Sequence, residues 1–295
     1  MNSAIIGATG FVGRHLAGEL SGRGHCAGYD LRAGEVGDVH VAACDIAREV
    51  PTLPPGTEAV FYLAQFPGYR DFPKGGGDLW GVNVAGVLRA VEAARAVGAR
   101  ALIYASTGTV YAPTFDPMCE SAPLRRDQPY ALSKVAGEEA LALVDQPRTC
   151  CVRLFGVFGP QQATMLVPGI TSRIRTGSAI MIEPHPSDPG DCDGLRISLT
   201  DVGDVCAGMI ALARRMIDGL DVARVVNLAA PRAVSIRQIG QAIAGTLGLE
   251  ARFEMGAKPR AGDYIADITL LRRIIDISFT RFDDSIARTL LDHAR

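Results

Sequence analysis

The chain has 295 residues, and 48% of them are hydrophobic, but Gly, Arg or Asp interrupts every long apolar run well short of the roughly 18 to 20 residues that a membrane span needs. Thirty basic and 32 acidic residues leave a formal charge of -2, which excludes a strong overall field that would recruit nucleic acid or an anionic membrane. No apolar leader precedes the first motif, so we expect a cytoplasmic protein. The length is sufficient for one large domain or two.

Short β-rich runs alternate with helical stretches through the first half of the chain. The expected strands are 3–6, 26–30, 39–42, 59–63, 101–105 and 149–155, and the expected helices are 11–22, 78–97 and 130–143. This alternation predicts an α/β fold, a Rossmann-type doubly wound parallel sheet with helices on both faces. The strands are apolar throughout rather than at alternate positions, which indicates burial on both faces of the sheet.

The pattern changes after Gly159 and Pro160. The second half contains helical segments at 168–176 and 201–217, a polar loop EPHPSDPGDCDG, a strand VVNLAA and a helix that begins near Ser235, whose hydroxyl suits an N-cap. We therefore expect a Rossmann domain at 1–160, completed by about 201–230, and a smaller C-terminal region at 161–200 and 231–295.

The segment GATGFVG places Gly7, Gly10 and Gly13 between the first strand and the first helix. At such a turn, unpaired backbone N–H groups meet the positive end of the helix dipole, and together they bind pyrophosphate. The three glycines predict, in order, a tight turn, close approach of phosphates to the backbone, and close packing of the helix on the strand. The sequence therefore predicts a dinucleotide cofactor at this turn.

Asp30 ends the next strand, about 20 residues beyond this turn. A carboxylate there accepts hydrogen bonds from the ribose hydroxyls of NAD and repels the 2′-phosphate of NADP, so it predicts NAD. Arg32 is close enough in sequence to neutralise such a phosphate, which keeps NADP as the alternative.

Tyr130 and Lys134, in YALSK, are four residues apart at the start of a helical stretch and therefore share one face. A nearby ammonium favours the phenolate, so we expect the pKa of Tyr130 to lie below its ordinary value of about 10, as a general base for an alcohol requires. Upstream, the strand at 101–105 continues into Ser106, Thr107 and Thr109, which we expect at the ligand-facing carboxyl edge of the sheet.

Taken together and in this order, the motifs are typical of one superfamily, and the chain resembles an extended short-chain dehydrogenase/reductase of the NAD-dependent epimerase/dehydratase group. The resemblance rests on GATGFVG (7–13), Asp30, CDI (44–46), YLA (62–64), Asn83, STGTVY (106–111), YALSK (130–134), VRLFGVFGP (152–160), RISLTDVGDV (196–205), NLAA (227–230) and RAGD (260–263). It implies a catalytic set of Thr107, Tyr130 and Lys134. It also implies that the smaller region binds substrate, with Arg196 and Arg260 on the diphosphate of a nucleotide sugar, because an arginine fork bonds two phosphate oxygens.

The same resemblance implies NAD as the cofactor and a binding set along the glycine turn and the ends of the first strands. Its members are Gly7, Thr9, Gly10, Phe11, Val12, Gly13, Asp30, Leu31, Arg32, Asp45, Ile46, Leu63, Ala64, Asn83, Tyr130 and Lys134. Within this set, Asp45 is expected by the adenine, and Ala64 and Asn83 along the wall of the cofactor cleft. By analogy we also expect a homodimer, formed by the helices near 78–97 and 130–145.

Gly108 and Thr109 follow the catalytic threonine, where members of the group that eliminate water carry Asp and Glu, and decarboxylating members carry Glu as the second residue. Hexose 4-epimerases carry a small residue and Thr, so the resemblance favours a nucleotide-sugar 4-epimerase that oxidises a ring hydroxyl transiently and returns the hydride to the other face. The alternatives are an NAD(P)-dependent sugar or keto-sugar oxidoreductase with net hydride transfer, and a non-catalytic dinucleotide sensor. Two departures indicate an atypical substrate: Gly156 stands where epimerases carry Asn, and the loop at 183–194 replaces a glycine-rich turn.

The seven cysteines include no C-x-x-C pair, and we expect reduced thiols that pack as small apolar side chains. Cys192 has Asp191, Asp193 and His185 nearby in the sequence, but their spacing fits no zinc or EF-hand pattern. The sequence therefore predicts no metal, and the balanced charge predicts no nucleic-acid or membrane partner.

Overall fold

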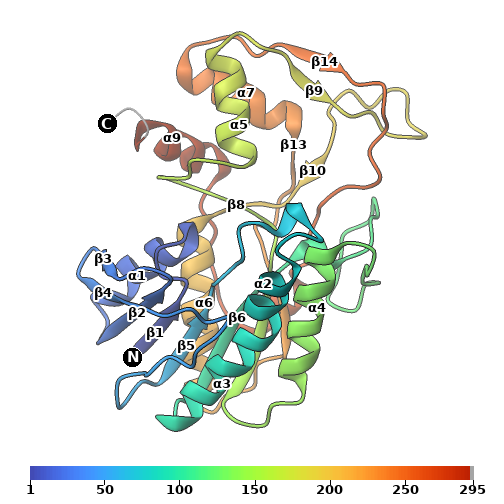
Figure 1. Cartoon of the computed structure of the whole chain (residues 1–295). Coiled ribbons are helices and arrows are strands. Elements are labelled where there is room, and N and C mark those ends of the chain that lie inside the picture. The colour runs from blue at the N-terminus through green and yellow to red at the C-terminus, as the bar shows by residue number, and fades with distance from the viewer. Residues whose placement is uncertain (293–295) are drawn as a thin grey trace.

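The computed structural model describes residues 1–292 and is built on an eight-stranded sheet with the order β12-β7-β6-β5-β1-β2-β4-β3 (Figure 1). Its strands are β1 (Ser3–Ile6), β2 (Cys26–Asp30), β3 (Gly34–Val36), β4 (Val39–Ala43), β5 (Ala59–Tyr62), β6 (Ala101–Thr107), β7 (Arg148–Leu154) and β12 (Val225–Leu228). Neighbouring strands run parallel except β3, which lies antiparallel to β4 at one edge. The chain extends from β1 to one side through β2 and β4 and then crosses to β5 and the other side. The predicted doubly wound parallel sheet is confirmed.

Helices cover both faces of this sheet. On one face, α1 (Phe11–Ser21) and α6 (Val202–Ile217) contact each other, and α3 (Gly86–Ala96) and α4 (Pro129–Ala142) lie on the other (Figure 1). Every residue of β1 and β5 is buried between these layers, which explains why these strands are apolar throughout. Within residues 1–292, no helix combines the length and the apolar character that a bilayer span requires.

A smaller part of the molecule lies beyond the carboxyl ends of the strands, at the top of Figure 1. It contains α5 (Leu166–Arg175), α7 (Ile236–Leu247) and α9 (Phe282–Asp292) around an apolar core of its own, together with the strand pairs β9 (Ile180–Ile182) with β14 (Phe253–Met255) and β10 (Arg196–Ile197) with β13 (Val234–Ser235). A further pair, β8 (Gly156–Phe158) with β11 (Leu199–Asp201), runs parallel. The chain then returns to the large sheet, because α8 (Thr269–Ile274) packs against β12. The division into a 1–160 domain and a substrate-binding region stays a prediction.

The N-terminus of α7 shows how local sequence sets an element boundary. The hydroxyl of Ser235 accepts a hydrogen bond from the backbone N–H of Gln238 at 3.1 Å, and the Gln238 side chain accepts one from the Ser235 N–H at 2.9 Å. This reciprocal capping satisfies two N–H groups that the first helical turn leaves free. The predicted N-cap at Ser235 is confirmed.

The single helix expected at 78–97 is wrong, because the structure divides it into α2 (Gly76–Trp80), a π-helical turn at Gly81–Ala85, and α3. Tyr62 of β5 donates its hydroxyl to the carbonyl of Val82 inside the π-helical turn. A Cβ on Gly86 would lie 2.5 Å from that hydroxyl. A side chain that inserts into the helical hydrogen-bond ladder explains the local change of period, which apolar spacing alone does not reveal.

The turn between β1 and α1 leaves no room for side chains at Gly7 and Gly13. Gly7 has φ +91°, which L-residues with a side chain rarely adopt, and a Cβ there would lie 2.6 Å from the backbone N of Ala64. A Cβ on Gly13 would lie 2.2 Å from the carbonyl oxygen of Gly7. Helix α1 can therefore approach the end of β1 this closely only with glycine at position 13.

Gly13→Ala tests this packing. We expect it to lower the free energy of unfolding by about 1 to 3 kcal/mol, because the backbone carbonyl of Gly7 must move away from the added methyl group. Gly18→Ala on the same helix is the control: no described atom lies within 4 Å of its added Cβ, and alanine favours the helix by about 0.5 to 1 kcal/mol. Urea unfolding followed by circular dichroism measures both variants, and equal stability of the two would contradict the packing.

Candidate active site

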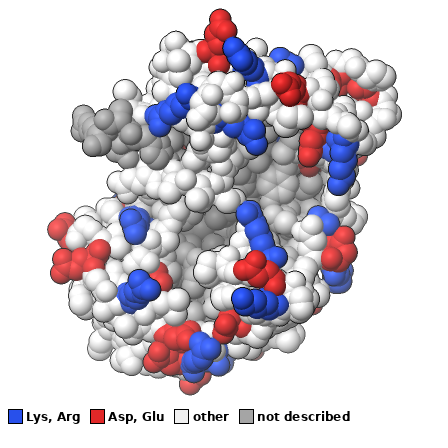
Figure 2. Space-filling view, turned by 45° about the horizontal axis from the view of Figure 1, so that its top comes forward, with Lys and Arg blue, Asp and Glu red and all other residues white. Residues whose placement is uncertain are grey.

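A cleft of about 840 Å³ runs over the carboxyl ends of the strands where the chain crosses from one half of the sheet to the other. Such a crossover point is where open α/β sheets bind ligands. Figure 2 shows the molecule hollowed between the sheet-bearing part and the smaller part, with walls that are mostly uncharged. The cleft is lined by the glycine turn, by residues that follow β2, β4 and β5, and by two residues of α4.

Most of the predicted cofactor-binding residues line this cleft. They are Gly7, Thr9, Gly10, Phe11, Val12, Gly13, Asp30, Leu31, Asp45, Ile46, Leu63, Ala64, Tyr130 and Lys134. The structure shows that these segments of the chain meet at one cleft, and their contacts with a bound cofactor stay a prediction.

Two residues of the predicted set lie elsewhere. Asn83 is fully buried in the π-helical turn, where its side-chain N–H donates to the Ser133 hydroxyl at 2.9 Å and its backbone carbonyl accepts from the Tyr104 hydroxyl at 3.3 Å. Asn83 therefore ties the π-helical turn to α4 and does not line the cleft. Arg32 is exposed, and it is not among the residues that line the cleft in the structure.

The glycine turn holds the carboxylate of Asp30 in place at the end of β2. One carboxylate oxygen accepts hydrogen bonds from the backbone N–H and the hydroxyl of Thr9, at 3.0 and 2.6 Å, and the other accepts from the backbone N–H of Leu31 at 2.8 Å. A carboxylate oxygen has more than one lone pair, so this anchoring leaves capacity for ribose hydroxyls. The arrangement fits NAD, whose ribose offers hydroxyls to a carboxylate at this position.

The three predicted catalytic residues meet at one end of the cleft. Thr107 ends β6, and Tyr130 and Lys134 lie in the first turns of α4. Lys134 is buried, its ammonium donates to the carbonyl of Ala105 at 2.9 Å, and it lies 4.7 Å from the centre of the Tyr104 ring. The helical spacing thus places phenol and ammonium in one site, as predicted.

The expected low pKa of Tyr130 is wrong for the protein by itself. Burial raises the pKa of this phenol well above 10, and the neighbouring phenol of Tyr264 raises it further, while a hydrogen bond with Thr107 opposes the shift. The ring of Tyr130 also packs against that of Tyr69, with centroids 4.6 Å apart. The four-residue spacing predicts which groups are neighbours, but it contains no information on how far the surrounding structure excludes water.

Burial acts on Lys134 in the opposite direction and lowers its pKa to about 7. The carboxylate of Glu138 counteracts this shift, but it is itself bound by the Arg153 guanidinium at 2.6 and 3.0 Å and by the hydroxyl of Ser106. Near neutral pH, Lys134 is therefore divided between its charged and neutral forms. Sequence analysis did not identify Glu138 and Arg153, which meet across α4 and β7 beneath the site.

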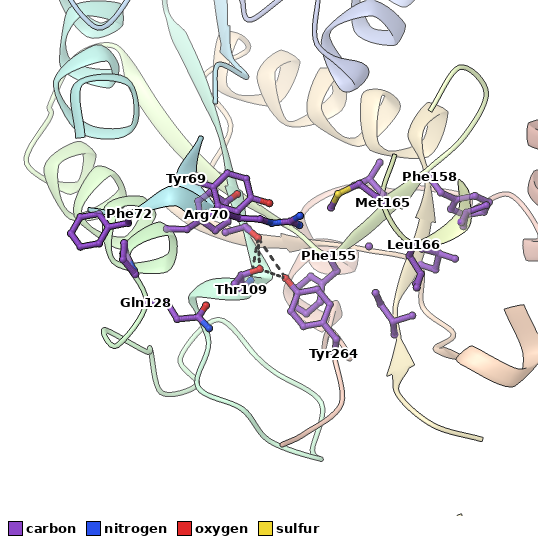
Figure 3. Close-up of a pocket in the computed structure, with 18 residues that line it drawn as sticks. Tyr69, Arg70, Phe72, Thr109, Gln128, Phe155, Phe158, Met165, Leu166 and Tyr264 are labelled. Atoms are coloured by element: carbon purple, nitrogen blue, oxygen red, sulfur yellow. Dashed lines mark hydrogen bonds between the residues drawn. The ribbon is translucent and has the colours of Figure 1, made fainter. Parts of the chain in front are cut away.

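A second cavity, of about 690 Å³, opens beside the cofactor cleft (Figure 3). Most of its walls are aromatic or aliphatic, with Phe155, Phe158, Leu166, Val167, Ile197 and Leu199 among the lining residues. Thr107 and Tyr130 line both cavities. Their hydroxyls therefore stand where the two cavities meet.

Tyr264 is a site residue that sequence analysis missed. Its hydroxyl lies 3.0 Å from the Thr109 hydroxyl and 3.5 Å from that of Thr107, and its ring packs on Phe155 with centroids 4.9 Å apart (Figure 3). A Cβ on Gly108 would lie 2.9 Å from both Phe155 and the Tyr264 hydroxyl, so glycine is needed there for packing as well. Tyr264 is 157 residues from Thr107 in the sequence, so no local sequence pattern predicts this contact.

Carboxylates pair with Arg196 and Arg260 in the structure, and the contact of these two arginines with a diphosphate stays a prediction. Arg260 donates to Asp191 at 2.6 Å and to Asp263 at 2.9 Å, and Arg196 donates to Asp191 at 2.9 Å. Burial by itself would raise the pKa of Asp191, but hydrogen bonds from the two arginines and a backbone N–H hold it far below its usual range. Neither arginine lines the cofactor cleft or the second cavity.

The polar loop that contains Asp191 shows no metal site. Within residues 1–292, no three His, Cys, Asp or Glu side chains are grouped so that they could share a metal ion. The ring of His185 packs against Phe115 with centroids 4.1 Å apart, and Cys192 is an exposed free thiol.

The sequence of the chain matches a known family and several known proteins. The model of the NAD dependent epimerase/dehydratase family matches residues 4–229. UDP-glucose 4-epimerase from Mycolicibacterium smegmatis is 33% identical over 157 residues, which cover 47% of this chain and 49% of that protein. Ceramide reductase from Caulobacter vibrioides is 28% identical over 225 residues, which cover 74% of this chain and 62% of that protein. The matches thus span between about half and three fifths of the relatives' own lengths.

The fold has many solved counterparts. MoeE5 in complex with UDP-glucuronic acid and NAD matches with a TM-score of 0.80 at 24% identity, over 100% of this chain and 99% of that one. Structural similarity at 24% sequence identity establishes the fold alone, and it extends over both the large sheet and the smaller part.

The raised pKa of Tyr130 predicts its titration. Without NAD, we expect no ionisation of Tyr130 below about pH 10, because burial disfavours the phenolate. The ultraviolet absorbance of tyrosinate, compared between the wild type and Tyr130→Phe, isolates this phenol, and Tyr69→Phe, which keeps the adjacent ring, is the control. A Tyr130 signal with a midpoint near neutral pH would contradict the raised pKa.

Proposed function

The chain belongs to the NAD dependent epimerase/dehydratase family, and from this premise we propose that it oxidises a secondary alcohol reversibly with NAD as the hydride acceptor. One observation carries the proposal: Thr107 and Tyr130 line both the cofactor cleft and the second cavity. An alcohol in the second cavity can therefore contact both hydroxyls beside the cleft. The position of Lys134 in the same cleft supports the acid–base part of the chemistry.

Each residue of the site has a distinct part in the proposed reaction. NAD, when bound, supplies a hydride acceptor and the positive charge of its oxidised ring. Thr107 donates a hydrogen bond that orients the substrate oxygen, and Tyr130 removes the proton from that oxygen. Protonated Lys134 favours the phenolate form of Tyr130, so loss of its charge near pH 7 weakens the base. Tyr264 holds the Thr107–Thr109 turn through its hydroxyl.

Epimerisation of a nucleotide sugar is the first candidate outcome. In this reaction the ketone remains in the site and the hydride returns to its other face. The match to UDP-glucose 4-epimerase supports it, as do Gly108 and Thr109, because neither side chain supplies the carboxyl groups that an elimination of water uses. The engaged Arg196 and Arg260 weigh against the nucleotide part of this substrate.

Net oxidation or reduction is the second candidate, and the lining of the second cavity favours it. A mostly apolar wall gives few hydrogen bonds to a sugar, whereas it suits an apolar alcohol or ketone. One of the relatives, ceramide reductase, is named as an enzyme that catalyses a net reduction. Stoichiometric NADH formation at 340 nm indicates a net oxidoreductase, and a new epimer without net NADH indicates an epimerase. If NAD binds and neither reaction occurs, the remaining candidate function is the non-catalytic dinucleotide sensor.

We also propose a cytoplasmic homodimer. The helices α3 and α4 lie side by side on the outer face of the sheet, and Leu88 of α3 is 44% exposed (Figure 1). Ala93 of α3 is buried inside the protomer and packs in the core beneath the helix, so it is not available for an interface. All seven cysteines are free thiols, which fits a reducing compartment.

Tyr130→Phe tests the proposed base. We expect turnover to fall by about two to four orders of magnitude, because the phenyl ring cannot take a proton, while NAD affinity stays within about threefold. NADH absorbance and epimer analysis measure turnover, and titration calorimetry measures NAD binding. Tyr69→Phe is the matched control, and near-normal turnover of Tyr130→Phe would refute the assignment.

Light scattering after gel filtration tests the dimer. At micromolar concentration we expect a mass of twice 31.2 kDa. Leu88→Arg should shift the protein toward the monomer, because a charge would be buried at the interface. Leu249→Arg, at a residue of similar exposure in the smaller part, should leave the mass unchanged, and a monomeric wild type would contradict the dimer.

A further inference from the structure

We infer that the substrate presents an uncharged, mainly apolar body to this chain in place of a nucleoside diphosphate, and that the Asp191 carboxylate occupies the anion position between Arg196 and Arg260. The inference rests on the proposed hydride transfer at Tyr130 and concerns the part of the substrate away from the reacting carbon. Three independent features carry it: the arginine cluster, the lining of the second cavity and the side chains at its rim.

The arginine cluster is already neutral. Asp191 accepts hydrogen bonds from Arg260 at 2.6 Å and from Arg196 at 2.9 Å, and Asp263 accepts one from Arg260 at 2.9 Å. Two guanidinium and two carboxylate groups leave no net charge. The side chains of Asp191 and Arg260 are 3% and 2% exposed, so a diphosphate would have to displace a buried carboxylate before it met Arg260. The Arg196 side chain is 39% exposed and already pairs with Asp191.

The second cavity carries almost no charge. Of the eighteen residues that line it in the described part of the chain, Arg70 is the one Arg, Lys, His, Asp or Glu, and its exposed guanidinium lies over the ring of the adjacent Tyr69. A diphosphate inside this cavity would therefore meet a single cation, Arg70, among mostly apolar walls. The cavity volume, about 690 Å³, lies within the range of sites that bury a ligand of drug size.

Apart from Tyr69, Arg70 and Gln128, the polar side chains of the cavity lie together. The hydroxyls of Thr107, Thr109 and Tyr264 form one hydrogen-bonded group, and Tyr130 lines the same cavity (Figure 3). Leucine, isoleucine, valine and phenylalanine side chains form much of the remaining wall. This division suits a molecule with one alcohol or ketone group on a bulky apolar body.

Apolar side chains at the rim are exposed to water. Phe72 is 47% exposed and Met165 is 61% exposed, although both line the cavity (Figure 3). Met165 has φ +84°, a conformation that is costly for a residue with a Cβ and that concentrates at ligand sites. An apolar ligand would remove both side chains from water, which favours its binding.

The substrate class that follows is a bulky neutral secondary alcohol, or its ketone in the reverse direction. In oxidation, the O–H proton passes to Tyr130, and the C–H bond breaks with its electron pair transferred to NAD. A carbon–oxygen double bond forms in the substrate. The alcohol loses two electrons, NAD gains them, and one proton is released overall.

Binding to the NAD-loaded protein tests the inference. Titration calorimetry is carried out with UDP and UDP-glucose as charged probes and with 2-decalol and androstanol as neutral probes. We expect a neutral probe to bind with Kd below about 100 μM, and UDP to show no binding with Kd below about 1 mM. UDP binding tighter than that, or failure of both neutral probes to bind, overturns the inference. If a neutral probe binds and no NADH forms, the proposed reaction fails while the substrate class stands.

Asp191→Ala tests the anion position directly. Its loss removes the carboxylate that pairs with both Arg196 and Arg260, while Arg260 keeps Asp263, so we expect the affinity for UDP to rise at least tenfold. Asp193→Ala is the matched control, because Asp193 belongs to the same loop and lies 3.7 Å from Arg237 at a more exposed site. Circular dichroism shows whether the variants are folded, and Asp191→Asn replaces Asp191→Ala if the latter is not. A folded Asp191 variant with no gain in UDP affinity contradicts the assignment.

Phe72→Ser tests the rim. We expect the KM of the neutral alcohol, or the Kd of the neutral probe, to rise about tenfold, with kcat within about twofold of the wild type. Leu220→Ser is the control, since Leu220 has the same 47% exposure and lines neither cavity. An unchanged KM and Kd in Phe72→Ser would contradict a role of the rim in binding an apolar body.

Discussion

The burial of the Lys134 ammonium beneath the carboxyl end of β6 is the constraint on which the site depends. A buried charge is costly unless it is paired, and Lys134 has the Ala105 carbonyl as its hydrogen-bond acceptor. Glu138 favours the charged form, but this carboxylate is shared with Arg153. The pKa of about 7 reflects this incomplete compensation. Lys134 is therefore a cation whose charge responds to small changes in its surroundings.

The same desolvation acts on Tyr130 with the opposite sign, because the charged form of a phenol is an anion. Burial raises the pKa of Tyr130 and lowers that of Lys134, so the protein by itself favours a neutral phenol next to a partly neutral amine. In the proposed reaction, ionisation of Tyr130 then depends on the positive charge of the oxidised cofactor. A base that forms only in the loaded site is protected from reaction in its absence.

Charge pairing is closer in one arginine cluster of the smaller part of the molecule. Arg196 and Arg260 are matched by Asp191 and Asp263, and the cluster holds the 183–194 loop against the segment that begins with Arg260. Charges paired in this way contribute to the arrangement of the chain, and a ligand anion has to compete with these carboxylates for the arginines. What remains open beside Tyr130 is a cavity with hydroxyl groups at one end and apolar side chains elsewhere.

The sequence by itself determined the features that depend on near neighbours: the buried strands, the glycine turn with Asp30 at the end of the next strand, the cap at Ser235, and the shared face of Tyr130 and Lys134. These follow from backbone conformation and from contacts within one or two adjoining elements, so their patterns are visible in the chain. Tertiary structure alone decided the two pKa shifts, the pairing of Arg260 with Asp191 across 69 residues, the burial of Asn83 against Ser133, and the approach of Tyr264 to Thr107 across 157 residues. The physical reason is that desolvation and charge pairing depend on everything that surrounds a side chain in space. The residue type sets which chemistry a side chain can perform. The surrounding side chains set its charge state and whether a ligand can reach it.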